Sequence, residues 1–155
     1  MADDNHTKIK SDLLLVLYRT EIEQGRHHEI LRSNISSYLN GFAAALIAAI
    51  SFQDSIDKQD IPLGSLLLAL GIFGIVVNLK HYERFRKHVD RAGAYRRELL
   101  QANNLSEIEK IRRNSDEKTE KRFRFLNNIR LYHLWTGVFL FHIFMGIYVV
   151  VRAFG

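Results

Sequence analysis

Four side chains that could bind an anion lie along one face of a predicted helix in the middle of the chain. They are spaced i, i+4, i+7 and i+11, and they are Arg84, His88, Arg91 and Tyr95. Residues three and four apart are neighbours on a helix, so these groups form a basic and aromatic stripe. Three interpretations fit the stripe: salt bridges inside a helical bundle, anionic lipid headgroups, or a pocket for a nucleotide or other phosphate ligand. Juxtamembrane Lys and Arg bind anionic lipid at about 1 kcal/mol per residue, so lipid is the expected partner.

Neither a metal site nor a catalytic site is indicated. Imidazole and carboxylate groups suit zinc, and the candidates are His27, His28, Glu29, His81 and His88. Adjacent histidines point to different helix faces, however, so only one of the first two could join a given cluster. The chain has no cysteine, no glycine-rich phosphate loop and no obvious nucleophile beside a base. We therefore predict a non-enzymatic protein without a metal or cofactor; a membrane-tethered nuclease or phosphotransfer enzyme using Arg84 and His88 is the enzymatic alternative.

Three apolar runs dominate the rest of the sequence, at 35–52, 62–79 and 134–151, and the stretches between them are rich in charge. A soluble helix would carry its apolar residues as a stripe, whereas these runs are apolar all round. Each run approaches the roughly 20 residues that cross a bilayer as a helix, with a lower limit near 17. The sequence therefore predicts an all-α membrane protein with three transmembrane helices.

Charge divides the chain into four parts and predicts its topology. An amphipathic lead-in helix (1–34) precedes a transmembrane hairpin (35–79), which is followed by a basic helical hairpin (80–130) and a third transmembrane helix (131–155). Lys and Arg are concentrated before the first run and after the second, whereas the loop between these runs is acidic. Cytoplasmic segments carry the excess of Lys and Arg, so we expect a cytoplasmic N-terminus and a cytoplasmic helical bundle in a multi-pass protein of the inner membrane.

Small and polar residues inside the runs are candidates for helix packing or a pore. Gly71 and Gly74 are expected to let helix backbones approach closely, in a tight hairpin of the first two runs and in a homo-oligomer. Asn40 and Asn78 lie at similar depth near the cytoplasmic boundary, where they would bond to each other or contact water. His142 is the ionisable residue nearest the middle of a run, which makes it a functional candidate; a neutral histidine bonded to a neighbouring backbone or hydroxyl group is the alternative.

Local signals predict how the water-side helices begin and bend. An amphipathic helix is expected from Ser11, with a break or bend at Gly25. Its apolar stripe at i, i+4 and i+8 is Leu14, Tyr18 and Ile22. Further along, Ser106 and Glu109 have the spacing of a capping box, which predicts that a helix begins there.

The order of these elements resembles a family of bacterial membrane proteins. A lead-in helix and two closely spaced spans are followed by Tyr82-Glu-Arg-Phe-Arg-Lys-His-Val-Asp-Arg-Ala92 and Tyr95-Arg-Arg-Glu-Leu99. This layout, over roughly residues 11–100, resembles the SLATT group of two-span proteins from conflict and antiphage systems, to which this chain adds a third span. The resemblance implies a bacterial, pore-forming or membrane-perturbing effector that is gated by a nucleotide signal. A scaffold that docks a cytoplasmic protein partner is the alternative hypothesis.

Overall fold

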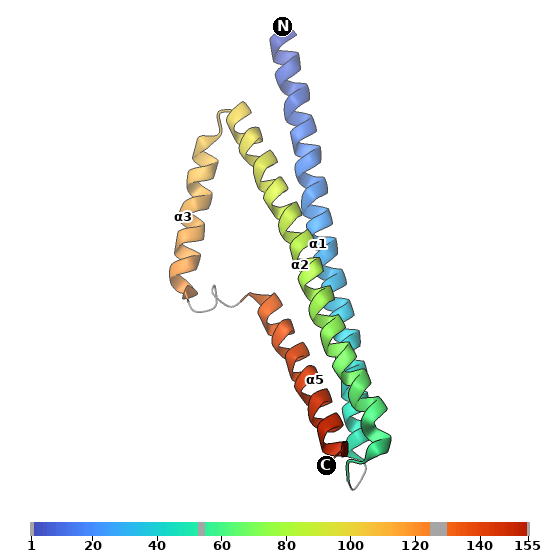
Figure 1. Ribbon diagram of the computed structural model, residues 1–155. Coiled ribbons are helices and arrows are strands. Elements are labelled where there is room, and N and C mark those ends of the chain that lie inside the picture. Colours follow the sequence, from blue (N-terminus) through green and yellow to red (C-terminus); the bar gives the residue numbers. More distant parts are fainter. Residues whose placement is uncertain (1, 53–54, 125–129, 155) are drawn as a thin grey trace. The chain divides into compact units, whose positions relative to one another are not determined.

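The computed structural model describes residues 2–52, 55–124 and 130–154, and every regular element within these ranges is helical (Figure 1). The elements are α1 (Ala2–Ser51), a short 3-10 helix η1 (Lys58–Asp60), α2 (Ile61–Ala102), α3 (Ser106–Arg122) and α5 (Leu131–Phe154). Three of them, α1, α2 and α5, contain segments long and apolar enough to cross a membrane. The predictions of an all-α fold and of three helices with the length and composition of membrane spans are confirmed.

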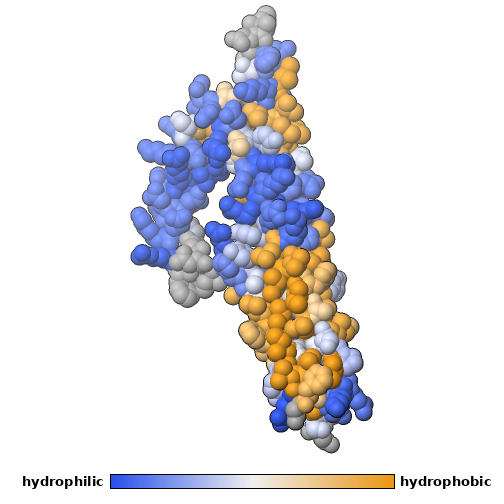
Figure 2. All heavy atoms as spheres, in the orientation of Figure 1, coloured by the Kyte–Doolittle hydropathy of each residue, from blue (hydrophilic) through white to orange (hydrophobic). Residues whose placement is uncertain are grey.

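The chain folds into two compact units, to which α1 and α2 both contribute. The charged unit consists of residues 1–29 and 83–129, and the apolar unit consists of residues 30–82 and 130–155. Figure 2 shows hydrophobic residues gathered over the apolar unit and mostly hydrophilic residues over α3 and the neighbouring parts of the charged unit. The boundaries between the two units along the chain fall at 29/30, 82/83 and 129/130.

Within the charged unit, α1 contributes a seam of less exposed residues that recur at alternating spacings of three and four. They are Ser11, Leu14, Tyr18, Glu21, Gly25 and His28. This spacing is that of a heptad repeat, in which a straight contact line returns every 3.5 residues. The expectation that Ile22 continues the buried stripe is wrong, because Ile22 is 43% exposed and Glu21 takes its place.

The predicted break at Gly25 is absent, and α1 also begins well before Ser11. Gly25 is buried against α2, where an added Cβ would lie 3.6 Å from Cβ of His88 and 3.8 Å from Cδ2 of Phe85. Glycine inside a helix costs about 1 kcal/mol relative to alanine. Packing of α1 on α2 offsets that cost, so the helix continues through the position.

In the apolar unit, α2 packs against α1 on one side and against α5 on another. The contact with α1 is built around a small buried cluster of Ala43, Leu46 and Leu67. The contact with α5 depends on glycine: Gly64 lies against Val149, and Gly146 lies against the backbone of Gly64 and Leu68. Small residues permit this close approach of helices in lipid, where no hydrophobic effect drives association.

The connection between α1 and α2 is tightened by two aspartates. The side chain of Asp57 accepts a hydrogen bond from the N–H of Gln59 at 2.7 Å, and Asp60 accepts one from the N–H of Asp57 at 3.0 Å. This reciprocal capping box satisfies backbone donors that would otherwise lack partners. Asp60 is fully buried, and η1 packs against α5.

Candidate functional site

An ionic cluster lies in the seam between α1 and α2 of the charged unit. Nδ1 of His88 lies 2.6 Å from Oε2 of Glu21, and Nη1 of Arg91 lies 3.8 Å from Oε1 of the same carboxylate. The His28 ring stacks on the His88 ring, with 5.3 Å between the ring centroids. Glu21 and His88 are both half-buried, so their hydrogen bond is stronger than it would be in water.

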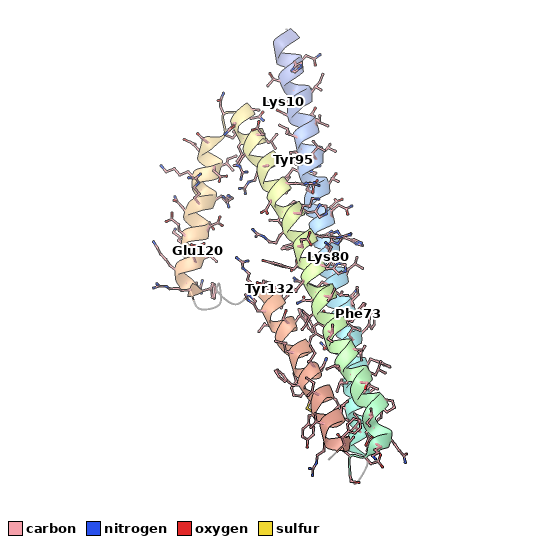
Figure 3. The ribbon with its side chains drawn as sticks, in the orientation of Figure 1. Lys10, Phe73, Lys80, Tyr95, Glu120 and Tyr132 are labelled. Atoms are coloured by element: carbon pink, nitrogen blue, oxygen red, sulfur yellow. The ribbon has the colours of Figure 1, made fainter. Side chains whose placement is uncertain are left out.

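The structure divides the predicted anion-binding stripe. His88 and Arg91 converge on Glu21, whereas Arg84 is exposed and forms no ion pair within the described part of the chain. Tyr95 is half-buried further along α2 (Figure 3). Two of the four groups therefore already face a carboxylate of the same chain, which makes this part of the stripe an internal salt bridge.

Sequence spacing could not predict that Glu21 pairs with His88, because the two residues lie 67 positions apart in the chain. A signal was nevertheless present. Glu21 lies three residues after Tyr18 and four before Gly25, so it is a carboxylate at a heptad position of the buried seam. A charge at such a position requires a partner from the facing helix.

A second cluster lies where α2 turns into α3. Asn104 has a φ of 53°, its N–H bonds to the carbonyl of Gln101, and the N–H of Leu105 bonds to the carbonyl of Leu100. This pair of bonds is the Schellman pattern, which satisfies the last carbonyls of a helix and reverses the chain sharply. Asparagine is among the few non-glycine residues that adopt this left-handed conformation readily.

The predicted capping box at Ser106 and Glu109 is not formed. The N-cap of α3 is Leu105, and no side chain caps it. Glu109 instead binds arginines: its carboxylate lies 2.8 Å from Nη2 of Arg112 and 3.5 Å from Nη2 of Arg96. The guanidinium offers stronger, charge-assisted hydrogen bonds than a backbone N–H does.

These contacts also favour the ionised form of Glu109. The hydrogen bond from Arg112, helped by the charges of Arg96, Arg112 and Arg113, lowers the pKa of Glu109 below its ordinary value. The same hydrogen bond raises the pKa of Arg112. Since Arg96 lies on α2 and Glu109 on α3, the ionised carboxylate joins the two helices.

We expect acid to weaken the contact between α2 and α3. A carboxylate whose pKa is lowered by folding stabilises the folded state above its unfolded pKa, and this contribution is lost as pH falls through the lower, folded value. Hydrogen exchange of α3 amides, corrected for the intrinsic pH dependence of exchange, should show reduced protection below the ordinary glutamate value of 4.5. Glu109→Gln should abolish the acid-dependent step, and the same step in this variant would contradict the assignment.

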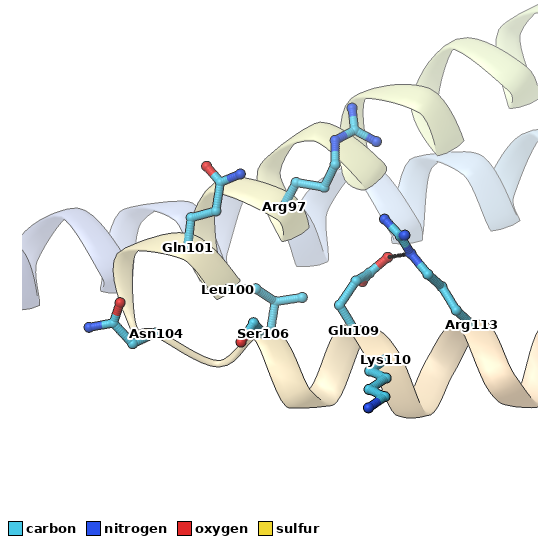
Figure 4. Close-up of a pocket in the computed structure, with 8 residues that line it drawn as sticks. All are labelled: Arg97, Leu100, Gln101, Asn104, Ser106, Glu109, Lys110 and Arg113. Carbon is cyan, nitrogen blue, oxygen red and sulfur yellow. Dashed lines mark ion pairs between the residues drawn. The ribbon is translucent and has the colours of Figure 1, made fainter.

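A hollow of about 620 Å³ lies beside this cluster (Figure 4). Its lining residues are Arg97, Leu100, Gln101, Asn104, Ser106, Glu109, Lys110 and Arg113. Glu109 forms ion pairs with Arg96, Arg112 and Arg113. By contrast, Arg97 and Lys110 form no ion pair with any described residue. The lining thus includes two cations that lack a carboxylate partner.

In the apolar unit, Asn78 connects α2 to α5. Asn78 is fully buried, and its Nδ2 donates to the carbonyl of Tyr132 at 2.9 Å and to Oγ1 of Thr136 at 3.0 Å. Tyr132 lies at the start of α5 (Figure 3). The predicted bond between Asn40 and Asn78 is absent, since neither Oδ1 has a protein partner. Asn78 bonds to α5 instead, because Oγ1 of Thr136 and the carbonyl of Tyr132, one turn apart on that helix, offer two acceptors together.

Gly71 and Gly74 also face α5 of the same chain. A Cβ at Gly71 would lie 2.6 Å from Cγ1 of Ile143 and 2.8 Å from the carbonyl oxygen of Phe139. A Cβ at Gly74 would overlap the Phe139 ring. The expectation that these two glycines mediate self-association is therefore corrected: they are occupied by contacts within the protomer.

His142 is buried on the inward face of α5. Its ring lies 6.0 Å from the Phe139 ring in an edge-on arrangement, and its Nδ1 has no hydrogen-bond partner among the described residues. The alternative of a bond from this nitrogen to a neighbouring backbone or hydroxyl group is not realised. The position is inside the helical bundle, away from the outward faces of the helix.

Comparison with known proteins gives no information on function, so a function has to be argued from the structure itself. No family model, curated protein or solved structure matches this chain. Among the residues that the structure describes, no group of three or more His, Asp or Glu is arranged to hold a metal ion. The internal Glu21 cluster, the α2–α3 hollow and the outward helix faces are the features from which a function can be argued.

Proposed function

We propose that this protein is a small membrane effector that self-associates through α1 and perturbs the bilayer in its assembled state. In this proposal the charged unit lies in the cytoplasm and receives a ligand or protein trigger. The observation that carries the proposal is the outward face of α1. This face exposes small residues in the apolar unit and large apolar residues in the charged unit.

In the apolar unit, α1 exposes small residues at heptad spacing. They are Ser37, Gly41, Ala44 and Ala48, and no atom lies within 4 Å of a Cβ added at Gly41. The outward faces of the other two spans are bulky, with Ile72, Phe73 and Val76 on α2 and Phe141, Phe144 and Ile147 on α5. Bulky side chains suit lipid, whereas small ones allow a second helix to pack closely.

In the charged unit, α1 exposes large apolar residues. Ile9, Leu13 and Val16 are 61%, 58% and 59% exposed at spacings of i, i+4 and i+7. In water, contact with a second apolar stripe would be favourable by about 25 cal/mol for each Å² buried. Val16 and Ser37 are separated by a whole number of seven-residue repeats, and so are Leu13 and Gly41, so the two stripes occupy the same heptad positions. One helix thus carries a hydrophobic stripe where we place water and a small-residue stripe where we place lipid, and a second copy of the chain would match both.

The proposal is tested by the mass of the detergent-solubilised protein and by ion leakage from liposomes that contain it. We expect a defined oligomer and leakage for the natural protein. The double variant Gly41→Leu/Ala44→Leu should lower the mass to that of the protomer and abolish leakage, because it fills the close approach between copies. Gly137→Leu is the matched control, since Gly137 is an outward glycine of α5 with open space around it. A monomeric natural protein, or an unchanged mass in the double variant, would overturn self-association through this face.

A non-enzymatic scaffold is the second candidate, and it rests on a feature of α3. In this otherwise strongly charged helix, Ile108 and Ile111 are 50% and 69% exposed at i, i+3. Exposed apolar side chains on such a helix suit a protein partner. A stable assembly that does not conduct ions would favour the scaffold over the effector.

A further inference from the structure

The α2–α3 hollow combines an excess of positive charge with a defined volume. Its lining includes Arg97, Lys110 and Arg113, and the neighbouring Arg96 and Arg112 belong to the same ion-pair cluster. Against these five cations stand the carboxylates of Glu109 and Asp116, the second of which binds Arg112. These seven side chains therefore have a net charge of +3, from five cations and two carboxylates.

Glu109 does not act as a free anion within the hollow. Its oxygens lie 2.8 Å from Arg112, 3.5 Å from Arg96 and 3.7 Å from Arg113. Figure 4 shows the Glu109 side chain directed toward Arg113, with the ion pair between them. A carboxylate engaged in this way holds the arginines in position and leaves Arg97 and Lys110 for an external anion.

Uncharged donors complete the lining. The amides of Gln101 and Asn104 and the hydroxyl of Ser106 lie at the connection between the helices. The first turn of α3, a helix of 17 residues, has no side-chain cap. The N–H of Ile108 donates to the carbonyl of Leu105 at 3.1 Å, which leaves the N–H groups of Ser106 and Glu107 for an acceptor. Helix N-termini favour anions through these amides and the helix dipole.

We propose that the hollow binds an anion bearing phosphate groups. Its volume of about 620 Å³ falls within the roughly 300–1,000 Å³ of small-molecule sites, which suits a phosphorylated small molecule or the phosphate of a lipid headgroup. The half-buried Leu100 supplies an apolar wall for the part of the ligand that carries the phosphate. The site lies beyond Tyr95 on α2 and differs in residues from the stripe predicted from the sequence. It does not depend on self-association.

Binding is tested by titrating sodium pyrophosphate into the detergent-solubilised full chain at low salt. We expect saturable binding, weakened about tenfold by Arg97→Gln and again by Lys110→Gln, because each removes a charge-assisted hydrogen bond. Arg86→Gln is the control, since Arg86 is also an exposed arginine of α2 but pairs with Asp90. Circular dichroism should show unchanged helix content in every variant.

A second arm distinguishes the source of the phosphate. The same variants are placed in phosphatidylcholine nanodiscs with and without phosphatidic acid, and retention of phosphatidic acid by the purified protein is measured. Loss of retention in the Arg97→Gln/Lys110→Gln variant indicates a lipid headgroup, and pyrophosphate binding without retention indicates a soluble ligand; both support the site. Absence of binding in both arms, or affinities that the double variant leaves unchanged, would overturn it. Because mass is recorded in the same samples, failure of this site is separable from failure of self-association.

Discussion

Gly74→Leu is expected to push α5 away from α2 and to destabilise the apolar unit. Even the first carbon of the new side chain would overlap the Phe139 ring, which is fully buried. Overpacking a tight core typically costs about 1–3 kcal/mol, and four added carbons at a helix–helix contact should reach at least the upper end of that range. Displacement of α5 would also break the two hydrogen bonds of Asn78.

The loss should appear as a lower midpoint when the purified protein is titrated from mild detergent into SDS and helix packing is followed by Trp135 fluorescence. Gly137→Leu introduces the same side chain into an outward position of α5, where no atom lies within 4 Å of the added Cβ. This control should unfold like the natural protein. Equal midpoints for Gly74→Leu and the natural protein would show that α2 and α5 do not pack as described.

Glu21→Ala is expected to destabilise the charged unit by roughly 1 kcal/mol, the lower end of the usual cost of leaving a buried polar group without its partner, because His88 is only half-buried. The substitution removes the acceptor that faces both His88 and Arg91. Both residues lie on α2, so the seam between the two helices should loosen locally. Limited proteolysis within the first 29 residues should accelerate, and amide exchange of that segment should increase.

Glu23→Ala provides the comparison, because Glu23 is exposed on the same helix and two residues away. We expect its proteolysis rate to match that of the natural protein. In a double-mutant cycle, His88→Ala should have a smaller effect in the Glu21→Ala background than alone. Additive effects would indicate that the carboxylate and the imidazole do not stabilise the unit together.

The positions of the helices could be predicted from sequence because their signals are local. Three runs that are apolar all round and nearly long enough to cross a bilayer predicted an all-α chain with three potential spans. The points at which helices end or continue were harder to predict from sequence. Glycine disfavours the helical conformation, but the effect of Gly25 depends on the residues of α2 against which it packs. Of these, Phe85 and His88 lie 60 or more residues away in the sequence.

The sequence patterns did not correctly predict which helix or side chain each of the following residues contacts. Gly71 and Gly74 have the spacing of a close-packed interface, yet spacing does not say which of two helices fills the groove. Similarly, the acceptors of Asn78 could not be predicted, because Thr136 belongs to a run that had no predicted contact with it. Glu109 had the spacing of a capping residue, and arginines on two helices competed for it.

The glycines of α2 have a consequence for biogenesis. Proteins are synthesised from the N-terminus, and their N-terminal parts fold first, so α1 and α2 are made well before α5. Until α5 is made, the grooves at Gly64, Gly71 and Gly74 have no Phe139, Ile143 or Val149 to fill them, and Asn78 has no acceptor from Tyr132. The pair of α1 and α2 therefore presents an open groove and an unpaired amide until the last helix of the chain has been made.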